Sequence, residues 1–278
     1  MNNLVTRTLA GAVFVAIMVG SLLFHPIFFG AFFLTIMIVA LAEFYHISIG
    51  NLFYLQQSLA IFSAVVFFLL IYIYRLYGID PRWIWATLFP LAAIPISNIF
   101  LSVNERRELS RFPYIYYGLG YIALPVSLAS CMVLKHGNFD GIVLLCFFIM
   151  IWASDTGAYC IGSLLGQRPN AKKLAPTISP KKSWWGFWGG IVVCVIAAVI
   201  LKLTGLMQLP FVHCIILSVI VSVSGVCGDL FESMWKRYFN VKDSGNCIPG
   251  HGGMLDRFDS ALLAVPIGAA YLALFGLI

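Results

Sequence analysis

Long uninterrupted apolar segments are the feature of this chain that most constrains its fold. They follow one another along the 278 residues, and within each the apolar residues are continuous rather than alternating with polar ones. Only 10% of the residues are charged, whereas a soluble domain carries about 25%. The chain therefore has too little polar surface to cover a water-soluble body. This composition indicates a polytopic membrane protein and excludes a disulfide scaffold, a disordered protein and a nucleic-acid-binding protein.

The apolar segments predict transmembrane helices. A helix needs about 20 residues to cross the hydrocarbon core of a bilayer. An open strand in lipid would leave backbone groups unpaired, and barrel strands would alternate in polarity. The sequence therefore predicts an all-α protein with about nine transmembrane helices. They cover residues 8–24, 27–45, 58–74, 84–101, 114–134, 141–163, 185–203, 210–228 and 259–277.

The distribution of positive charge predicts the orientation in the membrane. Most of the 17 lysines and arginines fall in the loops on one side of a nine-span topology. The positive-inside rule places that side in the cytoplasm, together with the N-terminus. We therefore expect a multi-pass protein of the inner (cytoplasmic) membrane, with its first helix retained rather than cleaved as a signal peptide. The exceptions, on the other side, are Arg75, Arg82, Lys135 and Lys202.

The acidic residues divide the chain into two regions. In residues 1–140 they lie mostly in loops or at span ends and form no cluster. In residues 141–278 all six lie at or near the cytoplasmic ends of predicted spans, next to the most basic loops. We expect residues 1–140 to be a transmembrane scaffold of about five spans. The catalytic region is expected in residues 141–278, with cytoplasmic loops at 164–184 and 229–258.

Asp155 lies inside an otherwise apolar predicted helix. Ionisable residues at membrane depth are costly and usually face a polar cavity. At about 100° per residue, Asp155 shares one stripe of the helix with Tyr159, Gly162 and Gly166. We expect this stripe to line a cavity, and the glycine spacing favours close helix packing. The alternative is a structural carboxylate that is bonded to a serine or tyrosine of a neighbouring helix.

The loop over residues 172–190 contains two lysine pairs, and the second pair precedes a serine at the start of a predicted span. Lysines and hydroxyls beside free backbone N–H groups form an anion site. Lys181, Lys182 and Ser183 are therefore candidate phosphate contacts. An ordinary positive-inside loop with an interfacial tryptophan belt explains the same residues equally well. That belt would consist of Trp184, Trp185 and Trp188.

The segment 228–259 contains the densest group of charged residues. Asp229, Glu232, Ser233 and Lys236 are spaced i, i+3, i+4 and i+7, so they share one face of a helix. Closely placed carboxylates suit Mg²⁺, which takes oxygen ligands and bridges substrate phosphates. A solvated loop with internal ion pairs is the alternative.

The same segment continues through Lys242 and Asp243 into a turn rich in glycine and proline, and it ends at Asp256 and Asp259. Glycines let backbone N–H groups approach an anion closely. His251, beside two glycines, is a candidate general base, although a lone histidine in this position serves equally as a hydrogen-bond donor or loop-shaping residue.

The stretch from Ser233 to Asp259 resembles the signature of the phosphatidate cytidylyltransferases, also called CDP-diacylglycerol synthases. That signature reads S-x-apolar-K-R, four residues, K-D, a Gly/Pro turn and H-G-G-x-x-D-R-x-D. Two upstream motifs, D-x-x-A-Y-x-x-G from Asp155 and S-P-K-K-S from Ser179, extend the resemblance over the second half. Trp235 and Trp185 depart from it, and Trp185 stands where members often carry Glu. The matching positions are Ser233, Lys236, Arg237, Lys242, Asp243, His251, Gly252, Gly253, Asp256, Arg257 and Asp259.

The resemblance implies transfer of CMP from CTP to phosphatidate, which forms CDP-diacylglycerol and pyrophosphate in phospholipid biosynthesis. It also implies Mg²⁺, a second cation such as K⁺, and a homodimer. Asp229 and Asp256 are the expected metal ligands and act in catalysis with Lys236 and Asp155. The expected substrate-binding residues are Ser179, Lys181, Lys182, Ser183, Ser233, Arg237, Lys242, Asp243, His251, Gly252, Gly253, Arg257 and Asp259.

Two other functions are compatible with the sequence. A cytidylyltransferase for a different phosphorylated lipid, such as an archaeal ether lipid, would carry the same motifs. A cation-coupled secondary transporter would use the carboxylates as a cation site, but such sites usually lie near the midplane of the membrane. The clustering of charge at one membrane face favours the enzyme.

Overall fold

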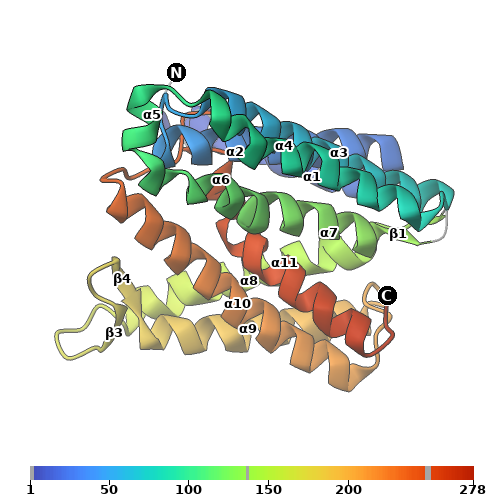
Figure 1. Ribbon diagram of the computed structural model, residues 1–278. Coiled ribbons are helices and arrows are strands. Elements are labelled where there is room, and N and C mark those ends of the chain that lie inside the picture. Colours follow the sequence, from blue (N-terminus) through green and yellow to red (C-terminus); the bar gives the residue numbers. More distant parts are fainter. Residues whose placement is uncertain (1–2, 136–137, 248–251) are drawn as a thin grey trace. The chain divides into compact units, whose positions relative to one another are not determined.

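The computed structural model describes residues 3–135, 138–247 and 252–278 (Figure 1). His251 lies outside the described residues. The chain folds into two compact units, and each is described by itself. Unit 1 comprises Met1–Asp140 and Asp243–Arg257, and unit 2 comprises Gly141–Lys242 and Phe258–Ile278.

The architecture confirms an all-helical polytopic membrane protein. Over the described ranges, 8 helices are long and apolar enough to cross a membrane, and a shorter apolar helix covers Thr8–Leu23. Together they correspond to the predicted spans. The structure adds two short antiparallel hairpins, which the sequence did not predict, in the connections between helices. Their strands are β1 (Leu134–Lys135), β2 (Asn138–Phe139), β3 (Lys173–Ala175) and β4 (Ser179–Ser183).

Unit 1 begins with three long helices. His25 separates α1 from α2, and its Nδ1 accepts a hydrogen bond from the backbone N–H of Ile27 at 3.2 Å. Pro26 occupies the first helical turn, where its missing N–H leaves no bond unmade. Gly78 follows the last residue of the third helix and caps it with a φ of 67°, a left-handed conformation that glycine adopts easily. The three helices are α1 (Asn3–Leu23), α2 (Pro26–Ser48) and α3 (Tyr54–Tyr77).

The two remaining spans of unit 1 are interrupted helices. The second of them contains a π-helical segment just before Pro125, which cannot donate a hydrogen bond to the preceding turn. Tyr45 of α2 fixes the start of this span, because its hydroxyl donates to the carbonyl of Ile115 at 2.8 Å. The first span comprises η1 (Pro81–Thr87), α4 (Leu88–Ile96) and η2 (Ser97–Phe100). Then follow α5 (Val103–Arg107), η3 (Leu109–Arg111), α6 (Pro113–Gly118), η4 (Leu119–Ala123) and α7 (Leu124–Val133).

Unit 2 contains α8 (Ile142–Leu164) and α9 (Trp184–Leu203), which pack side by side (Figure 1). Glycines make this approach possible: a Cβ on Gly162 would lie 3.4 Å from the Cα of Gly186, and a Cβ on Gly190 would lie 2.9 Å from a backbone oxygen of α8. The close helix packing predicted from the glycine spacing is confirmed. Gly162 and Gly186 face each other within one chain, whereas Gly190 faces Ser154. The homodimer stays a prediction.

The other long helices are α10 (Phe211–Tyr238) and α11 (Leu255–Leu274). The predicted span ends at residue 228, but α10 continues to Tyr238. Its extension forms i,i+4 contacts between Asp229 and Ser233 and between Glu232 and Lys236. The prediction that these four residues share one helical face is therefore confirmed.

Candidate functional site

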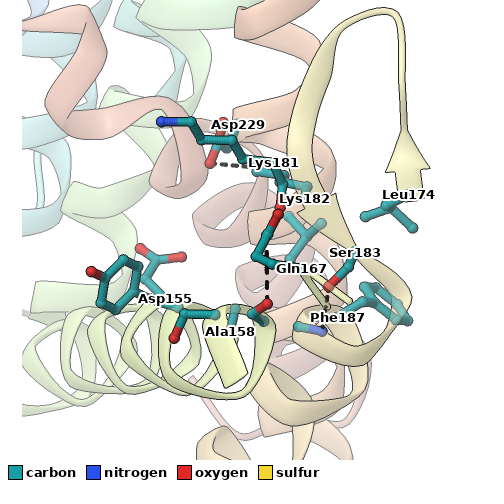
Figure 2. A pocket seen from close by; sticks show the side chains of 14 residues that line it. Asp155, Ala158, Gln167, Leu174, Lys181, Lys182, Ser183, Phe187 and Asp229 are labelled. Atoms are coloured by element: carbon teal, nitrogen blue, oxygen red, sulfur yellow. Dashed lines mark hydrogen bonds and ion pairs between the residues drawn. The ribbon is translucent and has the colours of Figure 1, made fainter. Parts of the chain in front are cut away.

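Unit 2 contains a cavity of about 570 Å³ at the ends of its helices (Figure 2). Its wall is partly charged and partly apolar. The charged side chains come from α8, from the β3–β4 hairpin and from α10, whereas Tyr159, Leu174 and Phe187 supply much of the apolar wall. Predicted site residues among the lining are Asp155, Lys181, Lys182, Ser183 and Asp229.

An ion pair crosses this cavity from the hairpin to α10. The Lys182 Nζ lies 2.6 Å from Asp229 Oδ2, with the two side chains 26% and 32% exposed. The other oxygen of Asp229 accepts a hydrogen bond from the Ser233 hydroxyl at 3.3 Å. Partial burial strengthens such a pair, and each charge stabilises the other where water is scarce. The pair thus places one carboxylate and one ammonium in the wall of the same cavity.

Asp155 faces the same cavity from α8 (Figure 2). It interacts electrostatically with Asp229 and Lys182. Among the described residues no side chain donates a hydrogen bond to the Asp155 carboxylate; the neighbouring Ser154 instead bonds to Ser222 of α10 at 2.7 Å. Asp155 is thus an exposed carboxylate in a cavity, as its position in an apolar helix led us to expect.

The β3–β4 hairpin is tied to the end of α8, and this places its lysines at the cavity. The Gln167 Nε2 donates to the carbonyl of Lys181 at 2.9 Å. Lys173 Nζ donates to the carbonyl of Gly166 at 2.9 Å and to the Gln167 Oε1 at 2.8 Å. Sequence reasoning did not single out Gln167 or Lys173 as positioning residues, because nothing in the sequence showed that the hairpin folds back onto α8.

Ser183 begins α9 in the way predicted for the start of a helix. Its Oγ accepts a hydrogen bond from the backbone N–H of Gly186 at 3.2 Å, and its side chain is buried. This is a helix N-cap. The same residue lines the cavity. Its role as a substrate contact stays a prediction.

Two further carboxylates lie near Asp229 in unit 2. Asp259 of α11 is beside Glu232 and interacts electrostatically with Asp229. Glu232 is fully buried and pairs with Lys236, whose Nζ lies 3.3 Å from its Oε2. Gly228 permits this arrangement, because a Cβ there would lie 3.2 Å from the Cα of Ser260 in α11. Acidic side chains thus outnumber their lysine partners in this part of the unit.

The carboxylates fit a divalent cation that is shared with a phosphorylated substrate. Over the ranges that the structure describes, no three Asp, Glu, His or Cys side chains converge closely enough to hold an ion by themselves. Mg²⁺ does not require this, since it is usually bound by one or two carboxylates, water and substrate phosphates. Asp155 and Asp229 provide such a pair in one cavity.

Asp256 belongs to unit 1, where the loop before α11 holds it. Its Oδ2 accepts hydrogen bonds from the backbone N–H groups of Ser244 at 2.9 Å and Gly253 at 2.8 Å. The preceding Gly252 adopts a φ of 82°, a conformation that side chains rarely tolerate. Gly253 and Ser244 of this loop thus bring backbone N–H groups to an anion, and within the chain that anion is Asp256.

Glu43 of α2 binds the same loop, and sequence reasoning missed it. Its carboxylate accepts hydrogen bonds from the Ser244 hydroxyl at 3.0 Å and from the backbone N–H groups of Met254 and Leu255, each at 2.9 Å. The available signal was its position within the apolar segment 27–45, because an ionisable residue there needs a partner.

The remaining predicted residues lie outside the cavity wall. Lys236 pairs with Glu232 as described, and Ser179 is half-buried at the start of β4. The other four are exposed on the surface of their own unit: Arg237, Lys242, Asp243 and Arg257.

Comparison with known proteins identifies the family. The chain matches the family described as "Cytidylyltransferase family" over residues 5–275. The chain belongs to this cytidylyltransferase family. It is similar to the phosphatidate cytidylyltransferase of Bacillus subtilis (strain 168), with 47% identity over 185 residues, which cover 66% of this chain and 57% of the relative.

Two other relatives are similar over a comparable part of the chain. The phosphatidate cytidylyltransferase of Rickettsia prowazekii (strain Madrid E) is 36% identical over 187 residues, or 65% of this chain and 79% of the relative. That of Staphylococcus saprophyticus is 35% identical over 182 residues, or 65% of this chain and 66% of the relative. The chain thus spans slightly under two thirds of the staphylococcal relative and less of the Bacillus one.

Proposed function

We propose that this family member transfers CMP from CTP to phosphatidate, releasing pyrophosphate and forming CDP-diacylglycerol. The observation that carries the proposal is the cavity of unit 2, in which Asp155, Asp229 and two lysines share a wall with apolar side chains. The names of the relatives point to the same substrates.

The mixed wall of the cavity suits an amphiphilic substrate. Pockets that bind lipids need apolar area for the chains and a few placed polar groups for the headgroup. Tyr159 is 77% exposed and lines the cavity together with Leu174 and Phe187. These side chains are proposed to contact the acyl part of phosphatidate, while the lysines hold its phosphate.

The reaction requires charge compensation rather than a general base. The nucleophile is an oxygen of the phosphatidate monoester, whose second pKa is about 6, so it is largely ionised at neutral pH. This oxygen forms a bond to the α-phosphorus of CTP, and the bond from that phosphorus to the pyrophosphate oxygen breaks. Both reactants are anions, so their approach is opposed by repulsion. Lys181 and Lys182 are proposed to lower this barrier by holding the non-reacting phosphate oxygens.

Asp155 and Asp229 are proposed to hold a divalent cation such as Mg²⁺ in this cavity. Asp256, which belongs to unit 1, is proposed as a further ligand of the divalent cation. When bound, the ion neutralises the triphosphate and stabilises the leaving pyrophosphate. Asp229 also keeps the Lys182 ammonium at the cavity through their 2.6 Å ion pair. A second cation such as K⁺ stays a prediction.

The proposed location is the cytoplasmic membrane, with the site facing the cytoplasm and the N-terminus inside. CTP is a cytoplasmic solute, and the basic loops favour that side. The three tryptophans at the start of α9 are 44–58% exposed, which suits a belt at the membrane surface.

The direct test is a turnover assay on detergent-purified protein. Labelled CTP and phosphatidate are supplied with Mg²⁺ or with EDTA, and lipid-extractable label and pyrophosphate are followed together. We expect equal amounts of both products with Mg²⁺ and neither with EDTA. Folded protein that stays inactive with phosphatidate but labels another phosphorylated lipid would show that the lipid is wrong, and failure with every lipid would reject the reaction.

A further inference from the structure

The carboxylate of Glu43 makes several close contacts with one loop from the other end of the chain. Its Oε1 accepts the Met254 N–H at 2.9 Å, while its Oε2 accepts the Leu255 N–H at 2.9 Å and the Ser244 hydroxyl at 3.0 Å. Glu43, the loop residues 243–247 and 252–254, and the first residues of α11 all belong to unit 1. More than 200 residues separate the partners in the sequence, so this contact can form only in the folded protein.

The loop is shaped around this carboxylate. A Cβ on Gly245 would lie 2.5 Å from Glu43 Oε1, and a Cβ on Gly253 would lie 2.5 Å from Glu43 Oε2. Contacts this short require the backbone to move, because the Glu43 carboxylate is itself held by hydrogen bonds. The approach of the loop to Glu43 therefore explains the absence of a side chain at Gly245, whereas a side chain at Gly253 would also meet the Ser244 hydroxyl and the backbone N of Gly245.

Ser244 connects Glu43 to Asp256. The Ser244 side chain is buried, and its hydroxyl donates to Glu43 while accepting the backbone N–H of Asp256 at 3.3 Å. The backbone N–H of Ser244 in turn donates to Asp256 Oδ2 at 2.9 Å. One residue thus contacts both carboxylates and connects Glu43 to Asp256 by hydrogen bonds.

We infer that Glu43 is a positioning residue that orients Asp256 through Ser244 and the backbone of Met254 and Leu255. The inference rests on the proposed function, in which Asp256 is a metal ligand. Groups that orient metal ligands typically change metal affinity or activity by about 10–100-fold when they are removed. A purely structural cap on α11 is the competing explanation, because Leu255 is the first residue of that helix.

The test compares Glu43→Gln with Glu105→Gln. Glu105 is a matched control, because it also lies in unit 1 and its carboxylate accepts hydrogen bonds from a serine hydroxyl and from backbone N–H groups, but far along the chain from the loop. In Glu43→Gln the side-chain NH₂ replaces one acceptor and meets an N–H donor. Ser244→Ala is the second variant, which breaks only the connection through the hydroxyl.

The first measurement is hydrogen exchange at the amides of Met254 and Leu255, without metal or substrate. We expect exchange to be about 10–100-fold faster in Glu43→Gln and unchanged in Glu105→Gln. The second is turnover as a function of Mg²⁺ concentration. Glu43→Gln and Ser244→Ala should raise the half-saturating Mg²⁺ concentration by about tenfold or more, whereas a structural cap would lower only the active fraction.

Each outcome decides the inference. Unchanged amide exchange in Glu43→Gln, or faster exchange with the Mg²⁺ dependence of the wild type, would overturn it. If Glu43→Gln does not fold, the Mg²⁺ dependence of Ser244→Ala decides in the same way. A wild type that turns over no CTP rejects the proposed function instead; faster exchange in Glu43→Gln would then leave Glu43 as a structural cap and overturn the positioning role.

Discussion

Glu43 and Asp155 are both carboxylates within long apolar helices, but the chain surrounds them differently. Glu43 accepts three hydrogen bonds from one loop of its own unit. Asp155 faces a cavity that it shares with Lys182 and Asp229, and among the described residues no side chain bonds it. An acidic residue in an apolar segment thus indicates a partner, and only the structure distinguishes a partner within the chain from a ligand.

The largest effect is expected from Asp229→Asn, on the ligand-facing side of this comparison. The amide removes the charge that pairs with Lys182 at 2.6 Å. We expect turnover of CTP to fall by at least about 100-fold, with the protein still folded. Asp80→Asn, at an exposed carboxylate of unit 1, is the control, and turnover within twofold of the wild type in Asp229→Asn would reject the site.

Asp155→Asn tests whether the two carboxylates really differ. No hydrogen bond from a described side chain is lost, so we expect the free energy of unfolding to stay within about 0.5 kcal/mol of the wild type while turnover falls. Glu43→Ala leaves three donors without their acceptor and should lower that free energy by about 1–3 kcal/mol. Thermal unfolding in detergent measures both. Equal destabilisation by the two substitutions would remove the contrast.

Gly245→Ala tests the packing of the loop against Glu43. The added methyl group would lie 2.5 Å from Glu43 Oε1, and its three nearest atoms all belong to the Glu43 side chain, so we expect a loss of about 1–3 kcal/mol in the free energy of unfolding. Gly120→Ala is the matched control, since a Cβ there meets nothing within 4 Å. A Gly245→Ala protein as stable as the Gly120→Ala protein would show that the loop does not depend on this contact.

The smallest effect concerns Glu105, a partly buried carboxylate that is bonded like Glu43 but mainly by one nearby residue, Ser102. Hydrogen bonds from the Ser102 side chain and then its backbone hold the pKa of Glu105 below its ordinary value of 4.5. The carboxylate therefore stabilises the fold above pH 4.5 and loses this contribution as the pH falls through the lowered pKa. Ser102→Ala should cost under about 1 kcal/mol at pH 7 and less at about pH 3. Thermal unfolding at the two pH values measures the change, and a larger cost at low pH would contradict the assignment.

The sequence predicts the helices and the charged part of the cavity wall because both follow from local patterns. Continuous apolar runs specify spans, and the i, i+3, i+4, i+7 spacing specifies the face of α10 that carries Asp229. The predicted span ends at residue 228, ten residues before the end of α10, because hydropathy reports where the membrane ends and not where the helix ends. The i, i+3, i+4, i+7 spacing predicts the helical extension as far as Lys236, and α10 ends at Tyr238, shortly before Asn240 with its φ of 56°.

What the sequence could not reveal are contacts between distant segments. The attachment of Lys173 and Gln167 to the end of α8 depends on how a hairpin folds back. The contact between Glu43 and residues 244–255 depends on the packing of segments that are 200 residues apart. Neither contact leaves a periodic signal along the chain.

The close packing of the loop against Glu43 restricts which substitutions this chain can accept during evolution. At Gly245 the Glu43 side chain occupies the space that a Cβ would need, whereas at Gly253 the Ser244 hydroxyl and the backbone N of Gly245 occupy it as well. Substitutions at residues in contact are not additive. Positions 43 and 245 are therefore expected to change together: a lineage that shortens residue 43 gains room for a side chain at 245, whereas Gly253 remains restricted by its own loop.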